Sequence, residues 1–169
     1  TRDAETAEIS VRSAITGHLV VSTLHTNDAI SSIVRLADMG VAPYLISNSV
    51  VGIVAQRLVR KVCQFCKYEE PATAEDIAIV GDGIPMITRG KGCKVCNNTG
   101  YKGRISIHEM VYIDKTLKRM IARSADSQEM LEYAKKTQGM RSLMDSAIDL
   151  VKEGVTTPEE VMKIAYYSD

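Results

Sequence analysis

The segment HLVVSTLHTNDAISSIVRLA, residues 18–37, decides the fold class. It opens with a short, mostly apolar run at residues 18–24, which predicts a buried strand of a parallel sheet. A polar turn follows at residues 25–28, and apolar side chains then recur at helical spacing as far as Ala37. Strand, polar turn and helix in this order are typical of α/β proteins, so we expect an α/β fold.

The polar turn is a candidate phosphate site. In open α/β sheets, ligands bind where the carboxyl end of a strand meets the next helix. Free amides and the positive end of the helix dipole attract phosphate there, and His25 and Thr26 could both donate to a phosphate oxygen. The structural alternative is that Thr26 or Asn27 only caps the helix and His25 is only a turn residue. Local features alone slightly favour that alternative.

Outside this segment the sequence predicts further helices, two strands and a turn-rich insertion. The predicted helices cover residues 4–15, a stretch beginning near Pro43, a short stretch at 74–80 and several stretches from Asp114 to the end. The predicted strands cover residues 50–62 and 105–111. Thr157, Pro158 and Glu160 predict a helix start, with Thr157 as N-cap and Glu160 at the capping-box position. The methionines before it are most simply core residues.

Two Cys-x-x-Cys pairs form the strongest motif, Cys63 with Cys66 and Cys93 with Cys96, and these are the only cysteines in the chain. Two tight turns can aim four sulfurs at one tetrahedral ion, which is typical of structural zinc. Residues 67–92 make a spacer longer than the usual zinc-ribbon spacing, so we expect local structure within it. Two disulfides, or four thiols without a function, are the alternatives. A thiolate-zinc site suits a reducing cytoplasm.

Composition limits the other classes of function. The chain has 169 residues with 45% hydrophobic content, enough for one domain with a small lobe attached. Its 21 basic and 21 acidic residues, with one Phe and no Trp, argue against a zinc-ribbon nucleic-acid binder, so we expect no nucleic-acid partner. No apolar run approaches the length of a membrane span. The first residue is Thr1 and no signal peptide is evident, so we expect a piece of a longer protein.

Several charged residues have both a structural and a functional interpretation. Arg2 and Asp3 could simply open a capped helix. Arg57 and Arg60, on a predicted strand, could pair with carboxylates or reach a phosphate across a subunit boundary. An ordinary surface role is equally simple for Arg104 and Glu109. We expect three regions, at residues 1–62, 63–103 and 104–169.

Taken together, several segments of the sequence resemble the C-terminal part of the secretion and pilus assembly ATPases, the GspE/PilB-like branch of the type II/type IV secretion superfamily. Residues 2–9, RDAETAEI, resemble the end of that family's Walker B signature. Residues 16–20 and 22–29 resemble its His box, and AQRL before the first cysteine pair and GYKGR after the second also recur there. Their order and spacing together are highly specific and run over the whole chain.

The resemblance implies the C-terminal portion of a RecA-like P-loop ATPase core, with a four-cysteine zinc insertion and a C-terminal helical lobe. It implies a cytoplasmic homo-hexamer at the inner face of the membrane, with ATP and Mg²⁺ between subunits and inner-membrane platform and assembly proteins as partners. His25, Arg2 and Asp3 would be catalytic, and Thr26, Arg57 and Arg104 would contact the nucleotide. The four cysteines would hold structural zinc.

Two elements of that family are missing from the sequence. No Gly-x-x-x-x-Gly-Lys-Ser/Thr loop cradles the phosphates, and the Walker B glutamate is also absent. We therefore expect that this chain alone does not hydrolyse ATP, although the full-length protein does. The alternative function is a non-catalytic zinc-binding module that mediates protein contacts.

Overall fold

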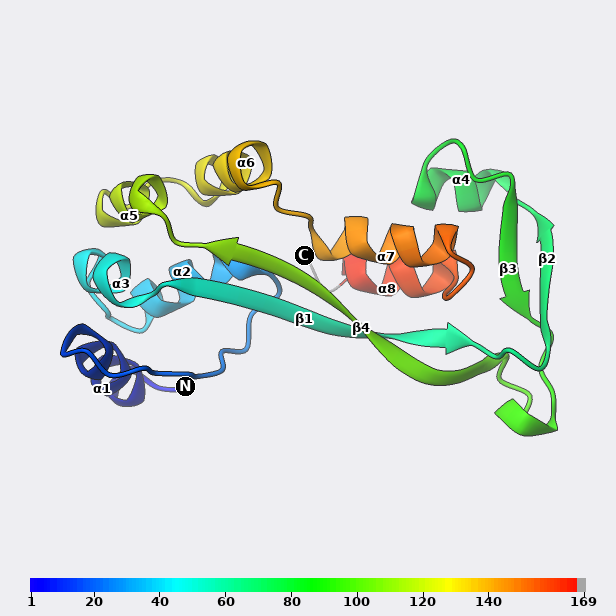
Figure 1. The fold of residues 1–169 in the computed structure, drawn as a ribbon, viewed down its shortest axis with the longest axis horizontal. Coiled ribbons are helices and arrows are strands. Elements are labelled where there is room, and N and C mark those ends of the chain that lie inside the picture. Colours follow the sequence, from blue (N-terminus) through cyan, green and yellow to red (C-terminus); the bar gives the residue numbers. More distant parts are fainter. Residues whose placement is uncertain (167–169) are drawn as a thin grey trace. The chain divides into compact units, whose positions relative to one another are not determined.

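The computed structural model describes residues 1–166, which form two compact units (Figure 1). The first unit consists of Thr1–Ala55 and Glu109–Met140, and the second consists of Gln56–His108 and the described residues from Arg141 onward. The boundaries of these two units differ from those of the three regions expected at residues 1–62, 63–103 and 104–169. The three-part division stays a prediction. No helix of the described residues is long and apolar enough to cross a bilayer.

The first unit is mainly helical. Its helices are α1 (Ala4–Ile15), α2 (Ala29–Asp38), α3 (Pro43–Ser49), α5 (Lys115–Ala122) and α6 (Ser127–Gln138). The apolar faces predicted by the helical spacing form one core, in which α3 packs against both α1 and α5. Ile33 of α2, Ile46 of α3 and Leu117 of α5 are buried there. The expected helices at residues 4–15 and at Pro43 are confirmed.

Two long strands, β1 (Gly52–Val62) and β4 (Tyr101–Tyr112), pair with each other and run through both units. They point in opposite directions in Figure 1. A second two-stranded sheet, β2 (Lys67–Pro71) with β3 (Met86–Gly90), is antiparallel and lies in the second unit. The predicted strands at 50–62 and 105–111 therefore exist, and the insertion does contain local structure.

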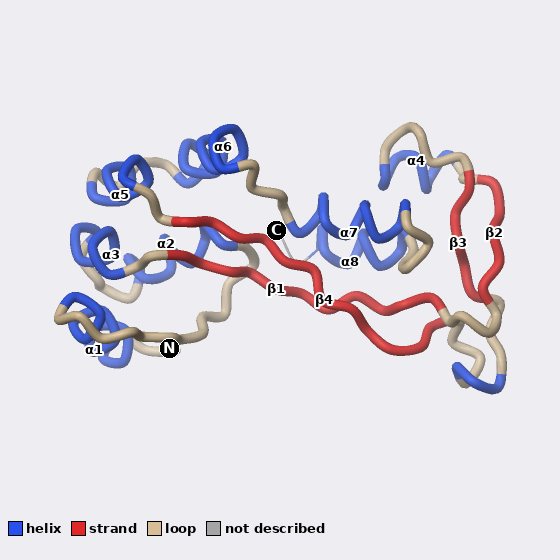
Figure 2. Tube along the Cα trace, in the orientation of Figure 1, coloured by secondary structure: helices blue, strands red, loops and turns tan. Residues whose placement is uncertain are grey.

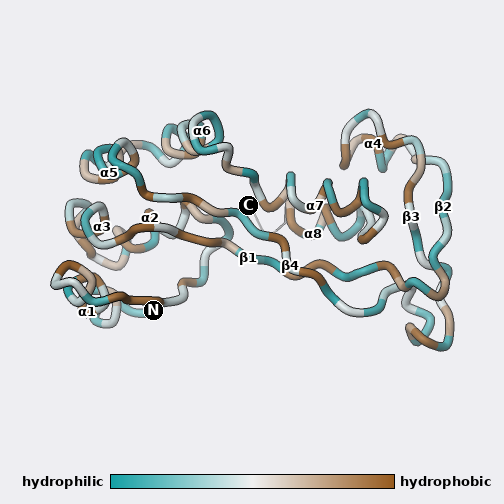
Figure 3. Tube along the Cα trace, viewed as in Figure 1, coloured by the Kyte–Doolittle hydropathy of each residue, from teal (hydrophilic) through white to brown (hydrophobic). Residues whose placement is uncertain are grey.

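The predicted strand at residues 18–24 is wrong. The segment is a loop between α1 and α2 (Figure 2), and Leu19 and Val21 are 90% and 88% exposed. The loop is apolar in Figure 3 all the same. A strand needs a neighbouring strand for its backbone groups. Within residues 1–166 these groups have instead a 3.1 Å hydrogen bond from the His18 N–H to the Ser13 carbonyl and a 2.7 Å hydrogen bond from the amino nitrogen of Thr1 to the Thr23 carbonyl. The expected parallel sheet is therefore not formed within these residues.

The second unit also contains α4 (Ala74–Val80), the short 3-10 helix η1 (Lys94–Cys96), α7 (Leu143–Lys152) and α8 (Pro158–Tyr166). The start of α8 lies against the paired strands: the Tyr101 hydroxyl is 2.8 Å from the Thr157 hydroxyl, and Thr156 donates to the Arg60 carbonyl at 2.7 Å. The predicted helix start is confirmed, since α8 begins at Pro158. The Glu160 carboxylate binds the guanidinium of Arg60 at 2.9 Å, a charged partner that local sequence does not predict, and its capping-box role stays a prediction.

Candidate metal centre and polar turn

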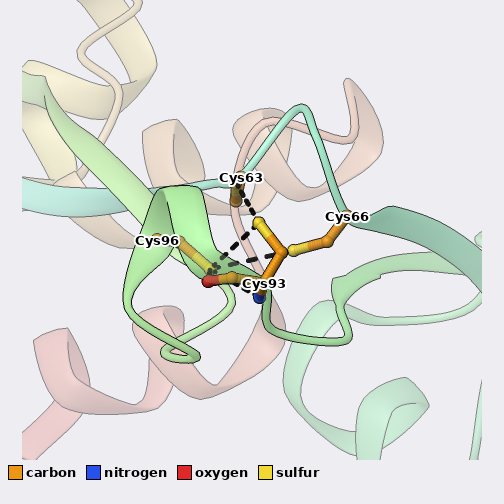
Figure 4. Close-up of side chains that lie close together, drawn as sticks. All are labelled: Cys63, Cys66, Cys93 and Cys96. Atoms are coloured by element: carbon orange, nitrogen blue, oxygen red, sulfur yellow. Dashed lines mark hydrogen bonds between the residues drawn. The ribbon is translucent and has the colours of Figure 1, made fainter.

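The end of β1 and the region around η1 bring the four cysteines together (Figure 4). Cys63 and Cys66 belong to one tight turn, in which the Cys66 N–H donates to the Cys63 carbonyl at 3.2 Å. Cys93 and Cys96 form the same turn around η1, again with a 3.2 Å backbone hydrogen bond. We call these two turns the knuckles. Each Cys-x-x-Cys segment therefore folds into the tight turn that the sequence predicts.

The sulfur geometry fits one tetrahedral ion. All four Sγ atoms lie within 4.8 Å of one another. The separation is 3.9 Å for Cys63 and Cys93, 3.9 Å for Cys66 and Cys96, and 3.7 Å for Cys93 and Cys96. Four sulfurs at about 2.3 Å from a central zinc would be about 3.8 Å apart. None of the four takes part in a disulfide, so the structure does not support the disulfide alternative.

The thiols do not have equal acidities in this arrangement. Burial is the main cause that raises the pKa of Cys66 to about 12. Burial acts the same way on Cys96 but is outweighed by donors from the backbone of Cys93 and Gly100, which lower its pKa to about 6. The Cys93 N–H is 3.2 Å from the Cys96 sulfur. Backbone donors aimed at a sulfur favour its thiolate form, which is the form that binds metal.

Glycines permit the close packing behind the second knuckle. A Cβ atom at Gly90 would lie 2.2 Å from the Gly100 carbonyl oxygen, and one at Gly100 would lie 2.6 Å from the Gly90 oxygen. The two backbones can approach this closely only without side chains. This contact fixes the end of β3 against the residue that follows the second knuckle.

The polar turn at residues 25–28 lies in the first unit and leads into α2. The cap of α2 is Asp28, whose carboxylate accepts from the Ser31 N–H at 2.6 Å, so the alternative that Thr26 or Asn27 is the cap is wrong. The Thr26 hydroxyl lies 3.2 Å from the Asp28 carbonyl and 2.8 Å from the Ser32 hydroxyl, so its donor is already engaged. The His25 side chain is exposed and makes no hydrogen bond within the described residues.

Glu109, for which the sequence equally allows a surface role, is buried in the structure. Glu109 is only 4% exposed and accepts a 2.8 Å hydrogen bond from the N–H of Ala29 at the start of α2. The signal was present in the strand alternation, because Glu109 lies between Ile107 and Val111 on the same, buried face of β4.

The other predicted residues are divided between the two units. Asp3 caps α1, accepting from the Thr6 N–H at 2.8 Å, and this hydrogen bond is the main cause that lowers its pKa. The side chains of Arg2 and Arg104 are exposed and have no partner within residues 1–166, whereas Arg57 is half-buried. The structure therefore brings the four cysteines together, but it does not gather the six proposed nucleotide residues within one unit.

Comparison with solved structures identifies the fold. A crystal structure of the pilus retraction motor PilT with bound ADP matches 97% of this chain and 37% of its own, with a TM-score of 0.65 and 24% identity. The ATPase DotB of Yersinia pseudotuberculosis matches 99% of this chain and 36% of its own, with a TM-score of 0.61 and 17% identity. The chain thus has the mixed α/β fold of a part of these ATPases, with four clustered cysteines.

The sequence comparison then defines the family. Residues 1–163 match the model described as Type II/IV secretion system protein, and the chain belongs to that family. It is 45% identical over 166 residues to type II secretion system protein E of Pseudomonas aeruginosa, covering 96% of this chain and 33% of that protein. It is 42% identical to the type IV pilus assembly ATPase PilB of Thermus thermophilus, covering 95% of this chain and 19% of PilB. The chain thus spans a third or less of the length of these relatives.

Proposed function

We propose that the full-length protein is a hexameric, cytoplasmic ATPase that powers type II protein secretion or type IV pilus assembly from the inner face of the cytoplasmic membrane. The observation that carries this proposal is the family match over residues 1–163, with relatives above 40% identity that are named as secretion or pilus ATPases. Residues outside this chain would supply the phosphate-cradling loop with its Mg²⁺ ligand. The chain alone is then inactive.

His25 is the proposed contact to the γ-phosphate of ATP. Its exposed ring has no partner within the described residues, so it is available to an incoming anion. Arg2 and Arg104 are exposed cations that would approach the nucleotide, with Arg57, from the same or a neighbouring subunit. Asp3 would act by holding α1, and Thr26 by holding the turn, because their polar atoms are already engaged.

Replacing His25 tests this role. In the full-length protein, H25A should lower kcat for ATP hydrolysis about 100-fold, as expected for the loss of a donor to developing charge. The matched control is H108A, which removes another exposed histidine, on β4, and should leave kcat unchanged. Wild-type kcat in H25A would contradict the proposal.

Structural zinc is the proposed occupant of the cysteine cluster. With four protein thiolates as ligands, the ion would have no open position for catalytic water and would serve to hold the knuckles together. Elemental analysis of protein purified without chelator should find about one zinc per chain. A folded protein with four titratable thiols and no metal would disprove the zinc site.

A protein-interaction role for the knuckles is a second candidate function. Phe65 and Val95 lie at the tips of the two knuckles and are 74% and 43% exposed. Exposed apolar side chains of this kind are common where a partner docks. The proposed partner is an inner-membrane platform protein. F65S should weaken co-purification with it while zinc content stays at the wild-type level.

A further inference from the structure

The helix that follows His25 is held by a carboxylate from a distant part of the chain. Glu109 on β4 accepts a 2.8 Å hydrogen bond from the N–H of Ala29, the first residue of α2. The N–H groups at a helix start have no partner within the helix, so an outside acceptor fixes where the helix begins. Both residues are buried, which shields this hydrogen bond from competition by water.

The same turn is held from within α2 as well. The hydroxyls of Thr26 and Ser32 lie 2.8 Å apart, and Ser32 is buried. The Asp28 carboxylate accepts a hydrogen bond from the Ser31 N–H. Two carboxylates, Asp28 and Glu109, therefore already engage the amides at the start of α2. That negative charge disfavours a phosphate at the helix terminus itself, and an incoming phosphate would be met by His25.

We propose that Glu109 is a positioning residue for His25. By fixing the Ala29 N–H, it would hold the preceding turn so that the His25 ring projects toward the γ-phosphate. Glu109 itself would not touch the nucleotide. This inference rests on the proposed role of His25 in ATP hydrolysis.

A pair of substitutions separates reach from charge at this position in the full-length protein. E109D keeps the charge but withdraws the carboxylate by one methylene, and should lower kcat at least about tenfold with KM for ATP within about twofold. E109Q keeps the reach and an oxygen acceptor, and should retain at least about a third of the wild-type kcat.

Glu160 provides the matched control. It is also 4% exposed and also accepts a backbone N–H, that of Arg60 at 2.9 Å, but it lies in the second unit. E160D should lower the melting temperature, as the same shortening at a buried site must, while kcat stays within about twofold of wild type. A purely structural role for Glu109 would make E109D behave like E160D.

The double variant H25A/E109D tests whether Glu109 acts through His25. If it does, the double variant should have the kcat of H25A within about twofold. If the losses in kcat of the two single variants multiply in the double variant, the inference is overturned. Wild-type kcat in folded E109D, with H25A impaired, would also overturn the inference, but the proposed function would then stand. Wild-type kcat in H25A would overturn the proposed role of His25 and this inference together. If E109D does not unfold cooperatively, the kcat of E109Q is the deciding measurement. A tenfold loss of kcat in folded E109Q would overturn the inference.

Discussion

Glu160 shows how one buried side chain joins residues that are far apart in the sequence. Its carboxylate accepts from the backbone N–H of Arg60 at 2.9 Å, from the Arg60 guanidinium at 2.9 Å, and from Lys163 at 2.6 Å. Burial alone would raise its pKa, but the donors from Arg60 and Lys163 outweigh burial and lower it. The ionised form therefore stabilises the folded second unit.

This pKa shift predicts acid sensitivity. Because the pKa is lowered in the folded protein, the stabilisation is fully present above the ordinary value of 4.5 and is lost as the pH falls through the folded-state pKa. The free energy of unfolding of E160Q should thus be below that of wild type at pH 7, and the difference should shrink below pH 4.5. Denaturant titrations at several pH values measure this.

The control for that series is E132Q, which changes an exposed carboxylate on α6. It should alter the free energy of unfolding by no more than about 0.5 kcal/mol, as expected for a surface substitution. A constant difference between E160Q and wild type from pH 7 to pH 3 would contradict the expected linkage.

Among the elements, the second knuckle depends most directly on glycine. Gly100 has φ +77° and faces the backbone of Gly90, whereas Gly103 has nearly the same φ, +79°, with nothing within 4 Å of a Cβ placed there. The pair therefore separates two effects of glycine, the positive φ and the close approach of two backbones.

Alanine at these two positions should have different costs. G103A should lower the free energy of unfolding by about 1 kcal/mol through the positive φ alone. G100A should lower it by at least about 1 kcal/mol more, because its Cβ would collide with the Gly90 backbone. Chemical denaturation with a metal-content measurement checks this. Equal losses in the free energy of unfolding of the two variants would show that the close approach of the Gly90 and Gly100 backbones adds nothing to the cost of the substitution.

The elements also show what sequence reasoning can reach. Local spacing predicts α1, α4, β1 and the knuckles, because caps, periodicity and tight turns act over a few residues. It fails for residues 18–24, where apolar composition predicts a strand but no neighbouring strand pairs with them in residues 1–166. It also misses the contacts of Glu109 and Glu160, since partners 80 and 100 residues away cannot be read from local patterns.

At the scale of the whole molecule, the two units differ in what stabilises them. The first has a continuous apolar core of helices. The second has a smaller set of buried apolar residues, supplemented by ion pairs and the cysteine cluster. Arg89, for example, pairs with the buried Asp76 at 2.8 Å. The second unit therefore depends more than the first on links outside its apolar core.

Metal removal should therefore affect the units unequally. After chelation, we expect amides in both knuckles to lose hydrogen-exchange protection, because the ion that would link the four sulfurs is gone. Amides of α1 and α3, in the first unit, should keep theirs. Adding zinc back should restore the knuckles, and an equal loss of protection throughout the chain would contradict this prediction.

The exposed loop at residues 18–24 has a consequence for handling the isolated chain. Leu19 and Val21 face solvent beside backbone groups that lack a strand partner, and such a segment can pair with the same segment of another molecule. Shelf life in solution would then depend on protein concentration more than on temperature. Dilute samples should stay clear, and concentrated ones should grow turbid while their helices are still folded.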